Sequence, residues 1–264
     1  MHFLPRCSAR LGMAALAALI ALAAGCRSTV LYDLTGPKGL PDYAAVIASP
    51  DRSTADLAID ARRQQPELLK FIEPRPGMTV LDMDAAAGYT TELLARVVGS
   101  GGKVYAQDGA QVSACAKARF AERMALPVMK NVEHVTSDFE DPIPAKAAGK
   151  LDIVTFLFSY HDTEAMGVDR AVMNRRIFEA LKPGGVYIVT DHSAKPGEGV
   201  SVAKTLHRID EALVRREVEE AGFQLLEKAR LLRNESDKRD TPVFNSPVQV
   251  DEFVLKFVKR KLLN

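Results

Sequence analysis

Apolar, strand-like runs alternate with helical segments along most of this chain, from residue 79 to residue 192. Each apolar run is short, and the segment after it repeats its apolar residues with helical spacing. Parallel strands need such crossover helices, which then cover both faces of the sheet. The alternation therefore predicts an α/β fold with a mostly parallel sheet and helices on both faces.

Seven strand-like runs are expected, at residues 75–83, 102–108, 132–138, 151–160, 186–192, 224–232 and 251–261. Helical spacing is found between them at residues 90–99, 111–125, 171–185 and 210–223. The last two strand-like runs follow one another without an intervening helical segment. Because a parallel pair needs a crossover, this connection predicts an antiparallel last strand. A further helical segment at residues 49–72 is expected to be interrupted near Pro66.

The beginning of the chain has the plan of a secretory signal. Arg6 and Arg10 precede an apolar run at 11–24, which is shorter than the ~20 residues of a membrane span. The ending "LAAGC" resembles the bacterial lipoprotein box, in which Cys26 becomes the lipid-bearing first residue. An ordinary signal peptide or an uncleaved anchor is the alternative. We expect a signal at 1–25, a tether at 26–50 and one domain at 51–264, in a protein exported to the bacterial cell envelope or periplasm.

Cysteine usage and charge limit the partners. Cys7 leaves with the signal and Cys26 carries the lipid, so Cys115 has no partner for an internal disulfide. The formal net charge is +1. This balance argues against a nucleic-acid-binding surface. Membrane association is therefore expected through the lipid on Cys26 alone.

A ligand site is expected where the strands end. In open α/β sheets, ligands bind beyond the carboxyl ends of the strands. Asp108, which ends the second strand, can accept both hydroxyl hydrogens of a ribose. Asp138 can accept from an adenine amino group, and Phe158 can form a wall against adenine or the second substrate. Helix capping is the structural alternative for these acids. The expected binding set is Asp82, Asp84, Ala86, Gly88, Tyr89, Asp108, Asp138 and Phe158.

The motifs that carry these residues resemble those of the class I S-adenosylmethionine-dependent methyltransferases. "GMTVLDMDAAAGYTTELLA" at 77–95 is similar to the first motif of that family, "VYAQD" at 104–108 to the second, and "LKPGGVYIVTD" at 181–191 to the turn and fifth strand. The resemblance implies a Rossmann-like, seven-stranded sheet with an antiparallel last strand and S-adenosyl-L-methionine as cofactor. Through "HD" at 161–162 and the segment 207–223, the chain is most similar to predicted exported bacterial methyltransferases.

The first loop departs from the pattern of that family. Asp84 and Ala86 stand where the family usually has glycine, whereas Gly88 is kept. A Cβ atom costs ~1–2 kcal/mol at a left-handed position, so we expect weaker cofactor binding rather than none. A nicotinamide dehydrogenase is the nearest alternative enzyme. The loop lacks two glycines of its G-x-G-x-x-G motif, and a pyrophosphate needs more room there than a methionine tail.

Three histidines follow strand ends or lie close to them. The expected catalytic residues are His161, His192 and Asp191, and His207 with Arg208 could close the pocket. Imidazole titrates near neutral pH and suits the removal of a proton from a methyl acceptor. Loop scaffolding and metal binding are the alternatives, and no set of metal ligands is assigned.

Two further alternatives concern the N-terminal helical segment and the activity. Arg62 and Arg63 could reach the carboxylate of the cofactor, or could lie on a solvated helix face. The expected function is methyl transfer from S-adenosylmethionine to a small-molecule acceptor. The alternative is a catalytically weak or inactive lipoprotein of the same fold that acts as a binding or accessory protein.

Overall fold

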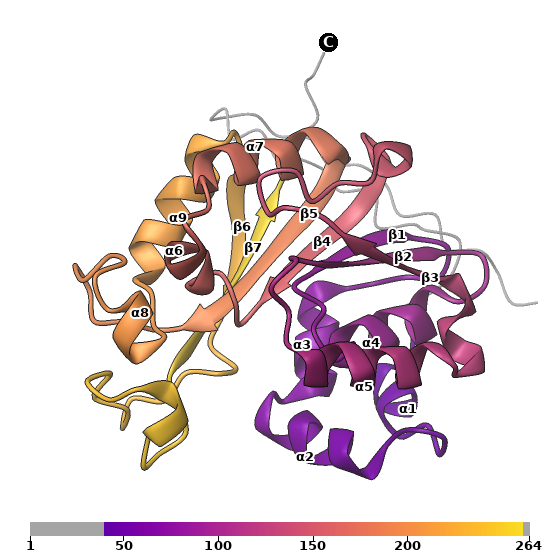
Figure 1. Ribbon diagram of the computed structural model, residues 1–264, viewed down its shortest axis with the longest axis horizontal. Coiled ribbons are helices and arrows are strands. Elements are labelled where there is room, and N and C mark those ends of the chain that lie inside the picture. Colours follow the sequence, from indigo (N-terminus) through magenta and orange to yellow (C-terminus); the bar gives the residue numbers. More distant parts are fainter. Residues whose placement is uncertain (1–39, 261–264) are drawn as a thin grey trace, which may run out of the picture. The chain divides into compact units, whose positions relative to one another are not determined.

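The computed structural model describes residues 40–260, which contain a seven-stranded sheet between two layers of helices (Figure 1). The strands are β1 (Thr79–Met83), β2 (Lys103–Asp108), β3 (Val132–Thr136), β4 (Leu151–Leu157), β5 (Leu181–His192), β6 (Gln224–Ala229) and β7 (Glu252–Val258). The helices are α1 (Tyr43–Ile47), α2 (Thr54–Arg62), α3 (Gln65–Ile72), α4 (Tyr89–Val98), α5 (Ala114–Met124), α6 (Asp162–Met166), α7 (Arg170–Ala180), α8 (Ala203–Leu206) and α9 (Glu211–Glu220).

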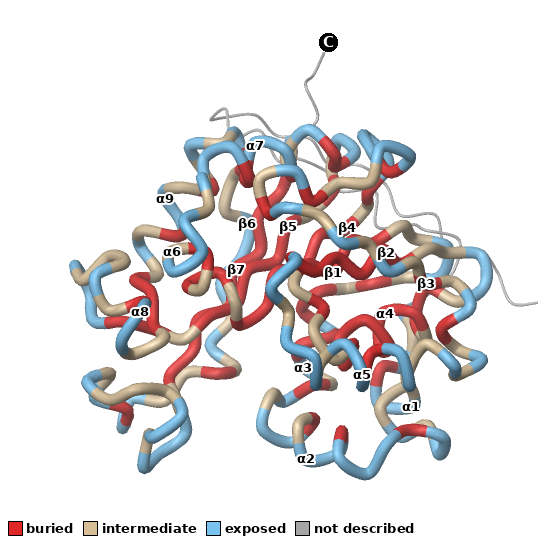
Figure 2. The backbone as a smooth tube through the Cα atoms, viewed as in Figure 1, coloured by how far each residue is buried: buried red, intermediate tan, exposed pale blue. Residues whose placement is uncertain are grey.

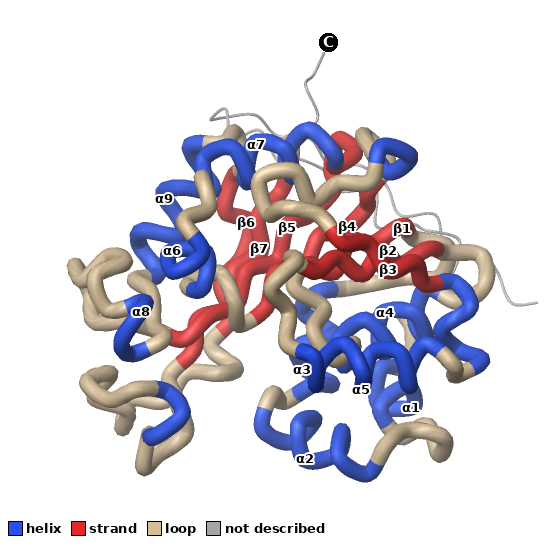
Figure 3. The backbone as a smooth tube through the Cα atoms, in the orientation of Figure 1, coloured by secondary structure: helices blue, strands red, loops and turns tan. Residues whose placement is uncertain are grey.

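The strand order is β3-β2-β1-β4-β5-β7-β6, and Figure 3 shows the strands as one continuous layer. The neighbours from β3 to β5 pair in parallel, whereas β7 pairs antiparallel with both β5 and β6. The order reverses at β1, because β2 lies on one side of it and β4 on the other. The predicted α/β class and the antiparallel last strand are confirmed.

The two faces of the sheet are buried under different helices. Alternate residues of each strand point to opposite faces. In β1, Val80 packs with α3, α4 and α5, and the adjacent Leu81 packs in the cluster that contains α7 and α9. The inner strands are therefore buried almost throughout, as Figure 2 shows for the central layer, whereas the edge strands β3 and β6 are partly exposed. This double burial explains why the strands are continuous apolar runs in the sequence.

The N-terminal boundary of the domain differs from the predicted one. The tether was expected to reach residue 50, but residues 43–47 form α1 and Tyr43 is 3% exposed. Its hydroxyl donates to the carbonyl of Pro74 at 2.9 Å. Burial of an aromatic ring is a large apolar gain, and it holds this short helix on the domain. Residues 1–39, which include the predicted signal and Cys26, lie outside the described residues.

The interruption near Pro66 is confirmed. Gln64 adopts a left-handed conformation with φ 45°, and α3 begins at the next residue with Pro66 in its first turn. Proline is tolerated there because first-turn amides have no partner within the helix. None of the helices within residues 40–260 is long and apolar enough to cross a lipid bilayer.

Candidate functional site

The loop between β1 and α4 forms the floor of the site. Asp84 and Ala86 have φ values of 52° and 50°, and Gly88 has φ 77°. Two of the three left-handed positions are therefore ones where the sequence replaces glycine, and the expected conformational cost applies at these two. Gly88 cannot be replaced in the same way, because an added Cβ would lie 2.8 Å from Cδ2 of Phe120. The loop keeps the conformation of a glycine-rich turn with two residues that carry side chains.

Asp108, at the end of β2, holds this loop in place. One carboxylate oxygen accepts from the amide of Ala86 at 2.8 Å, and the other lies 2.7 Å from Nε2 of His134. The side chain is 1% exposed, and burial raises its pKa. Each carboxylate oxygen has two acceptor positions, so a ribose hydroxyl can still bind beside these partners.

Asp82 and Tyr89 have structural contacts in this arrangement. The carboxylate of Asp82 accepts from the hydroxyls of Thr91 at 2.6 Å and Thr155 at 2.7 Å. Burial raises its pKa from 3.8 to about 6. The hydroxyl of Tyr89 donates to Asp60 on α2 at 2.5 Å. These two members of the predicted binding set therefore connect β1, β4, α2 and α4 below the loop.

Asp84, in the loop after β1, has a carboxyl group whose neighbours lie at or beyond the ends of β2 and β4. Burial raises the pKa of its carboxyl group, which is hydrogen-bonded to Ser159 and has the charges of Asp108 and Asp162 nearby. Asp138, beyond the end of β3, is exposed, and the neighbouring hydroxyl Oγ of Ser137 is buried without a hydrogen-bond partner among the described residues. Side chains that can accept hydrogen bonds therefore lie at the carboxyl ends of β1, β2 and β3.

Phe158 follows β4 in a strained conformation. Its φ of 66° is rare for a bulky side chain, and such strain persists where the surrounding structure enforces it. The guanidinium of Arg63 lies 4.3 Å from the centre of the Phe158 ring and 5.1 Å from that of Tyr89. Burial lowers the pKa of Arg63 to about 10, and within residues 40–260 its buried Nε has no hydrogen-bond partner.

Arg62 and Arg63 differ in environment, although they are adjacent at the end of α2. The Arg62 side chain is 51% exposed and lies 3.6 Å from Glu252, whereas Arg63 is inserted between the two aromatic rings. Both line a cavity of about 540 Å³ above Phe158. Its other lining residues are His192, Val243, Phe244, Val248, Gln249, Val250 and Glu252. Of the two predicted alternatives, contact with a ligand carboxylate is compatible with the position of Arg63. A place on a solvated helix face describes Arg62.

His161 is fixed by Asp191 through two hydrogen bonds. Its backbone amide donates to one carboxylate oxygen at 2.7 Å, and its Nδ1 lies 2.8 Å from the other. Burial lowers the pKa of this imidazole, but Asp191 and Asp162 outweigh burial and raise the pKa from 6.5 to about 10. The two carboxylates therefore stabilise the protonated form of the residue that was expected as a general base.

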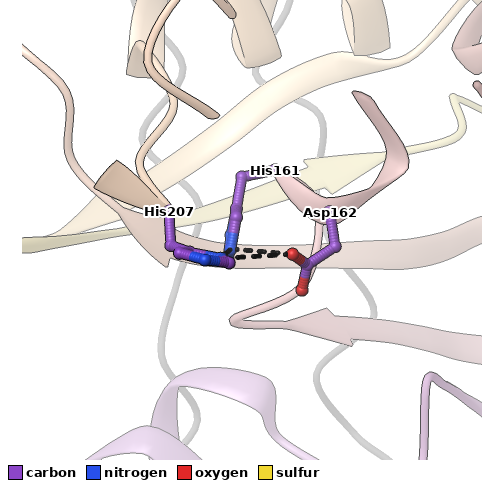
Figure 4. A group of neighbouring side chains, drawn as sticks. All are labelled: His161, Asp162 and His207. Atoms are coloured by element: carbon purple, nitrogen blue, oxygen red, sulfur yellow. Dashed lines mark hydrogen bonds and ion pairs between the residues drawn. The ribbon is translucent and has the colours of Figure 1, made fainter. Parts of the chain in front are cut away.

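Two more residues gather at the free edge of His161, as Figure 4 shows. Its Nε2 lies 3.2 Å from Oδ1 of Asp162 and 3.3 Å from Nδ1 of His207. His207 ends α8 with φ 54°, again a rare conformation for a side chain of this kind. Its ring contacts Phe244 at 4.9 Å between centroids, which brings the group to the wall of the cavity.

His192 lies beside His161, whereas Arg208 is buried away from the cavity. The His192 ring lies 5.6 Å from that of His161, and its Nδ1 is 3.0 Å from Glu252. Arg208, which was expected to close the pocket, is fully buried and pairs with Asp237 at 2.8 Å. Its role is to hold the segment before β7 in place. A guanidinium with its partners buried beside it is not free for a ligand.

The residues of the site fit a cofactor that carries both positively and negatively charged groups. Buried carboxylates with raised pKa values favour a cation, and a pyrophosphate would be repelled by Asp84 and Asp108. The buried guanidinium of Arg63, in contrast, needs an anion. S-adenosylmethionine has a sulfonium, an ammonium and one carboxylate, and it therefore matches this charge pattern better than a dinucleotide does.

Three contacts of the site were missed from the sequence. His134, interpreted as structural, is bonded to the carboxylate expected to bind ribose. Glu252 approaches His192 from β7, and Asp162 joins His161 and His207. The two-residue alternation of β3 places His134 on one face, but the pairing register of β2 and β3 decides which carboxylate it contacts.

Comparisons with known proteins agree with this geometry. A family model described as "Methyltransferase domain" matches residues 74–237, which is more than half of the chain. A protein-L-isoaspartate O-methyltransferase of Pyrobaculum arsenaticum is 28% identical over 153 residues, 57% of this chain and 67% of the relative. A similar solved structure is a SAM-dependent methyltransferase from Aquifex aeolicus, with a TM-score of 0.55, 21% identity and coverage of 83% of this chain and 98% of that one.

The same fold is also found in a structure described as a [4+2]-cyclase, SpnF, with a TM-score of 0.58, 15% identity and coverage of 76% and 81% of the two chains. The fold alone therefore does not decide the reaction. The family is one of methyltransferases and the Aquifex aeolicus structure is described as SAM-dependent, which agrees with the cofactor expected from the sequence. The chain belongs to the methyltransferase domain family.

Proposed function

We propose that this protein transfers a methyl group from S-adenosylmethionine to a small-molecule acceptor that binds in the cavity above Phe158. The observation that carries the proposal is the Arg63 guanidinium, whose buried Nε has no hydrogen-bond partner within residues 40–260, together with the buried carboxyl groups at the strand ends. This pairing of an anion site with a cation site matches the two ends of the amino-acid part of the cofactor. Bound there, the cofactor supplies an electrophilic methyl group.

Each part of the cofactor is bound by residues of complementary charge and suitable size. Asp108 and Asp138 accept from the ribose and adenine portions, and the small side chain of Ala86 leaves room over the loop. Asp84 receives the ammonium group, and Arg63 receives the carboxylate. Phe158 separates this half of the site from the acceptor half, where its ring lies 5.9 Å from that of His192.

The acceptor side combines apolar walls with histidines. Val243, Phe244, Val248 and Val250 line the cavity, so the acceptor has an apolar body. His192 lines its polar end, and the ring of His161, fixed by Asp191, lies 5.6 Å from that of His192. Catalysis then comes mainly from alignment of the acceptor with the methyl group, because fixed geometry removes much of the entropic part of the barrier. Histidine contacts to the acceptor heteroatom add orientation.

The test compares two ligands that differ only in the amino-acid portion. The full chain is titrated calorimetrically with S-adenosylhomocysteine and with 5′-methylthioadenosine, which lacks the carboxylate and the ammonium. We expect Arg63→Ala to weaken S-adenosylhomocysteine binding by about 10- to 100-fold, the usual value of a charge-assisted hydrogen bond. Binding of 5′-methylthioadenosine should stay unchanged.

Arg62→Ala is the matched control, since the Arg62 side chain is 51% exposed and its guanidinium lies 5.8 Å from the centre of the Phe158 ring, farther than that of Arg63. It should leave both affinities within about 2-fold, as expected for an exposed, screened charge. An equal loss of affinity for both ligands in Arg63→Ala would show that Arg63 does not bind the carboxylate. No heat and no thermal shift of the wild type at millimolar S-adenosylhomocysteine would favour the accessory-protein alternative.

A further inference from the structure

His161, Asp162 and His207 bring three potential metal ligands to one point (Figure 4). They come from the loop after β4, the first residue of α6 and the end of α8, so 46 residues separate the two histidines. Their donor atoms all lie within 4.8 Å of one another. Two imidazoles and one carboxylate form a ligand set suited to divalent first-row transition metals.

The separations of the donor atoms match those of a metal site. The Nε2 of His161 is 3.2 Å from Oδ1 of Asp162 and 3.3 Å from Nδ1 of His207, and the third side of the triangle is 3.5 Å. Zinc bonds to nitrogen and oxygen are about 2.0–2.2 Å long, and tetrahedral ligands are then about 3.3–3.5 Å apart. One ion above this triangle therefore reaches all three atoms with little movement.

The surroundings of His161 also fit a ligand rather than a simple core histidine. Asp191 lies 2.8 Å from Nδ1, so that nitrogen faces a carboxylate and Nε2 faces the triangle. Metal-bound histidines commonly have this carboxylate behind the ring, where it fixes the tautomer and orientation.

Exposure indicates which kind of site this is. The His161 side chain is 4% exposed, whereas those of Asp162 and His207 are 32% and 35% exposed. One side of the triangle is therefore open to solvent, next to the wall that Phe244 forms. Structural zinc sites are closed by four protein ligands, and catalytic ones keep a position for water or substrate.

We propose that His161, Asp162 and His207 bind one divalent transition-metal ion, such as Zn²⁺, with an open coordination position, and that Asp191 positions His161 from behind. A hydrogen-bonded cluster without a metal is the competing explanation. The proposal is independent of the proposed methyl transfer, because metal binding is measured in the absence of cofactor. Failure of one can thus be distinguished from failure of the other.

The experiment measures zinc binding to the full, untagged chain after chelator treatment and dialysis. Calorimetric titration with Zn²⁺ and elemental analysis should give a bound equivalent that His207→Gly removes, with an affinity loss of at least about 100-fold. Glycine at 207 suits the left-handed backbone, so the variant should fold. Asp162→Asn should also weaken binding strongly. Asp191→Asn should weaken it by about 10- to 100-fold, as for a residue that orients a ligand.

His134→Ala is the matched control, because His134 lies on β3 and contacts Asp108 instead of the triangle. It should keep the zinc equivalent that His207→Gly loses. Co²⁺ provides a second readout, since four-coordinate Co²⁺ absorbs visible light much more strongly than six-coordinate Co²⁺. Zinc binding that is absent in the wild type, or unchanged in His207→Gly and Asp162→Asn, would show a hydrogen-bonded cluster only and overturn the proposal.

Discussion

Backbone strain in the cofactor loop is concentrated in two residues with side chains. Asp84 and Ala86 have left-handed φ values, at positions where glycine has no steric cost. Aspartate tolerates this region better than most residues, but alanine does not. The loop therefore stores conformational energy at Ala86, directly beside the carboxylate of Asp108 that holds its amide.

Ala86→Gly should relieve this strain. We expect the free energy of unfolding to rise by about 1 kcal/mol, because glycine adopts the left-handed region without the steric cost of a Cβ atom. Chemical denaturation measures the change. Ala87→Gly is the control in the same loop, because its φ is not positive. This variant should lose about 0.5–1 kcal/mol, and a loss in both variants would contradict the strain at Ala86.

Asp82→Asn should change how stability depends on pH. The folded pKa of Asp82 is raised from 3.8 to about 6, so the folded state holds a proton that the unfolded state has released between these values. Stability from this group is fully present below pH 4 and is lost as pH rises through about 6. A shift of about two pKa units corresponds to about 3 kcal/mol.

Unfolding free energies at pH 4 and pH 7 test this expectation. The wild type should lose stability relative to Asp82→Asn over this interval, because the variant has no carboxyl to ionise between Thr91 and Thr155. Parallel pH profiles of the two proteins would show that the carboxyl of Asp82 ionises normally despite its burial.

At the scale of elements, short N-terminal helices complete the site. The end of α2 supplies Arg63, and Asp60 on the same helix pairs with Arg52 at 2.6 Å and accepts from Tyr89. Helix α1 packs against α3 and α4 through Tyr43, in a cluster with Leu69 and residues of α4. A stable position for Arg63 therefore depends on a segment that precedes the first strand.

Tyr43→Ala should destabilise the domain by about 3 kcal/mol, since it removes a buried ring and leaves a cavity against α3 and α4. Urea denaturation provides the measurement. Leu40→Ala is the control, because Leu40 is 55% exposed and its loss should change stability by less than about 0.5 kcal/mol. A negligible effect of Tyr43→Ala would mean that α1 belongs to the tether after all.

At the scale of the whole molecule, we propose that the protein is exported and lipid-anchored through Cys26. The basic start, the apolar run and the "LAAGC" sequence support this proposal. One acyl modification alone gives marginal membrane binding, so stable anchoring needs the two or more chains typical of dual acylation. A signal peptide cleaved elsewhere would leave a protein without an anchor.

Cys26→Ser should release the protein from membranes into the soluble fraction. Cell fractionation with mass analysis of the mature N-terminus checks both the location and the modification. Cys115→Ser is the control, because Cys115 is an exposed free thiol of the domain and should not affect membrane association. Membrane association that persists in Cys26→Ser would indicate an uncleaved anchor.

The sequence by itself determined the α/β class, the seven strands and the ends at which the acids lie. These features are local, because hydrophobic periodicity and turn residues act within a few positions. The assembled site, in contrast, depends on contacts between segments that are far apart in the sequence. The pairing of Asp108 with His134 follows from strand register, and the triangle of His161, Asp162 and His207 follows from the packing of α6 beside α8. Only the tertiary structure decides such contacts, because they join segments whose separation no periodic pattern records.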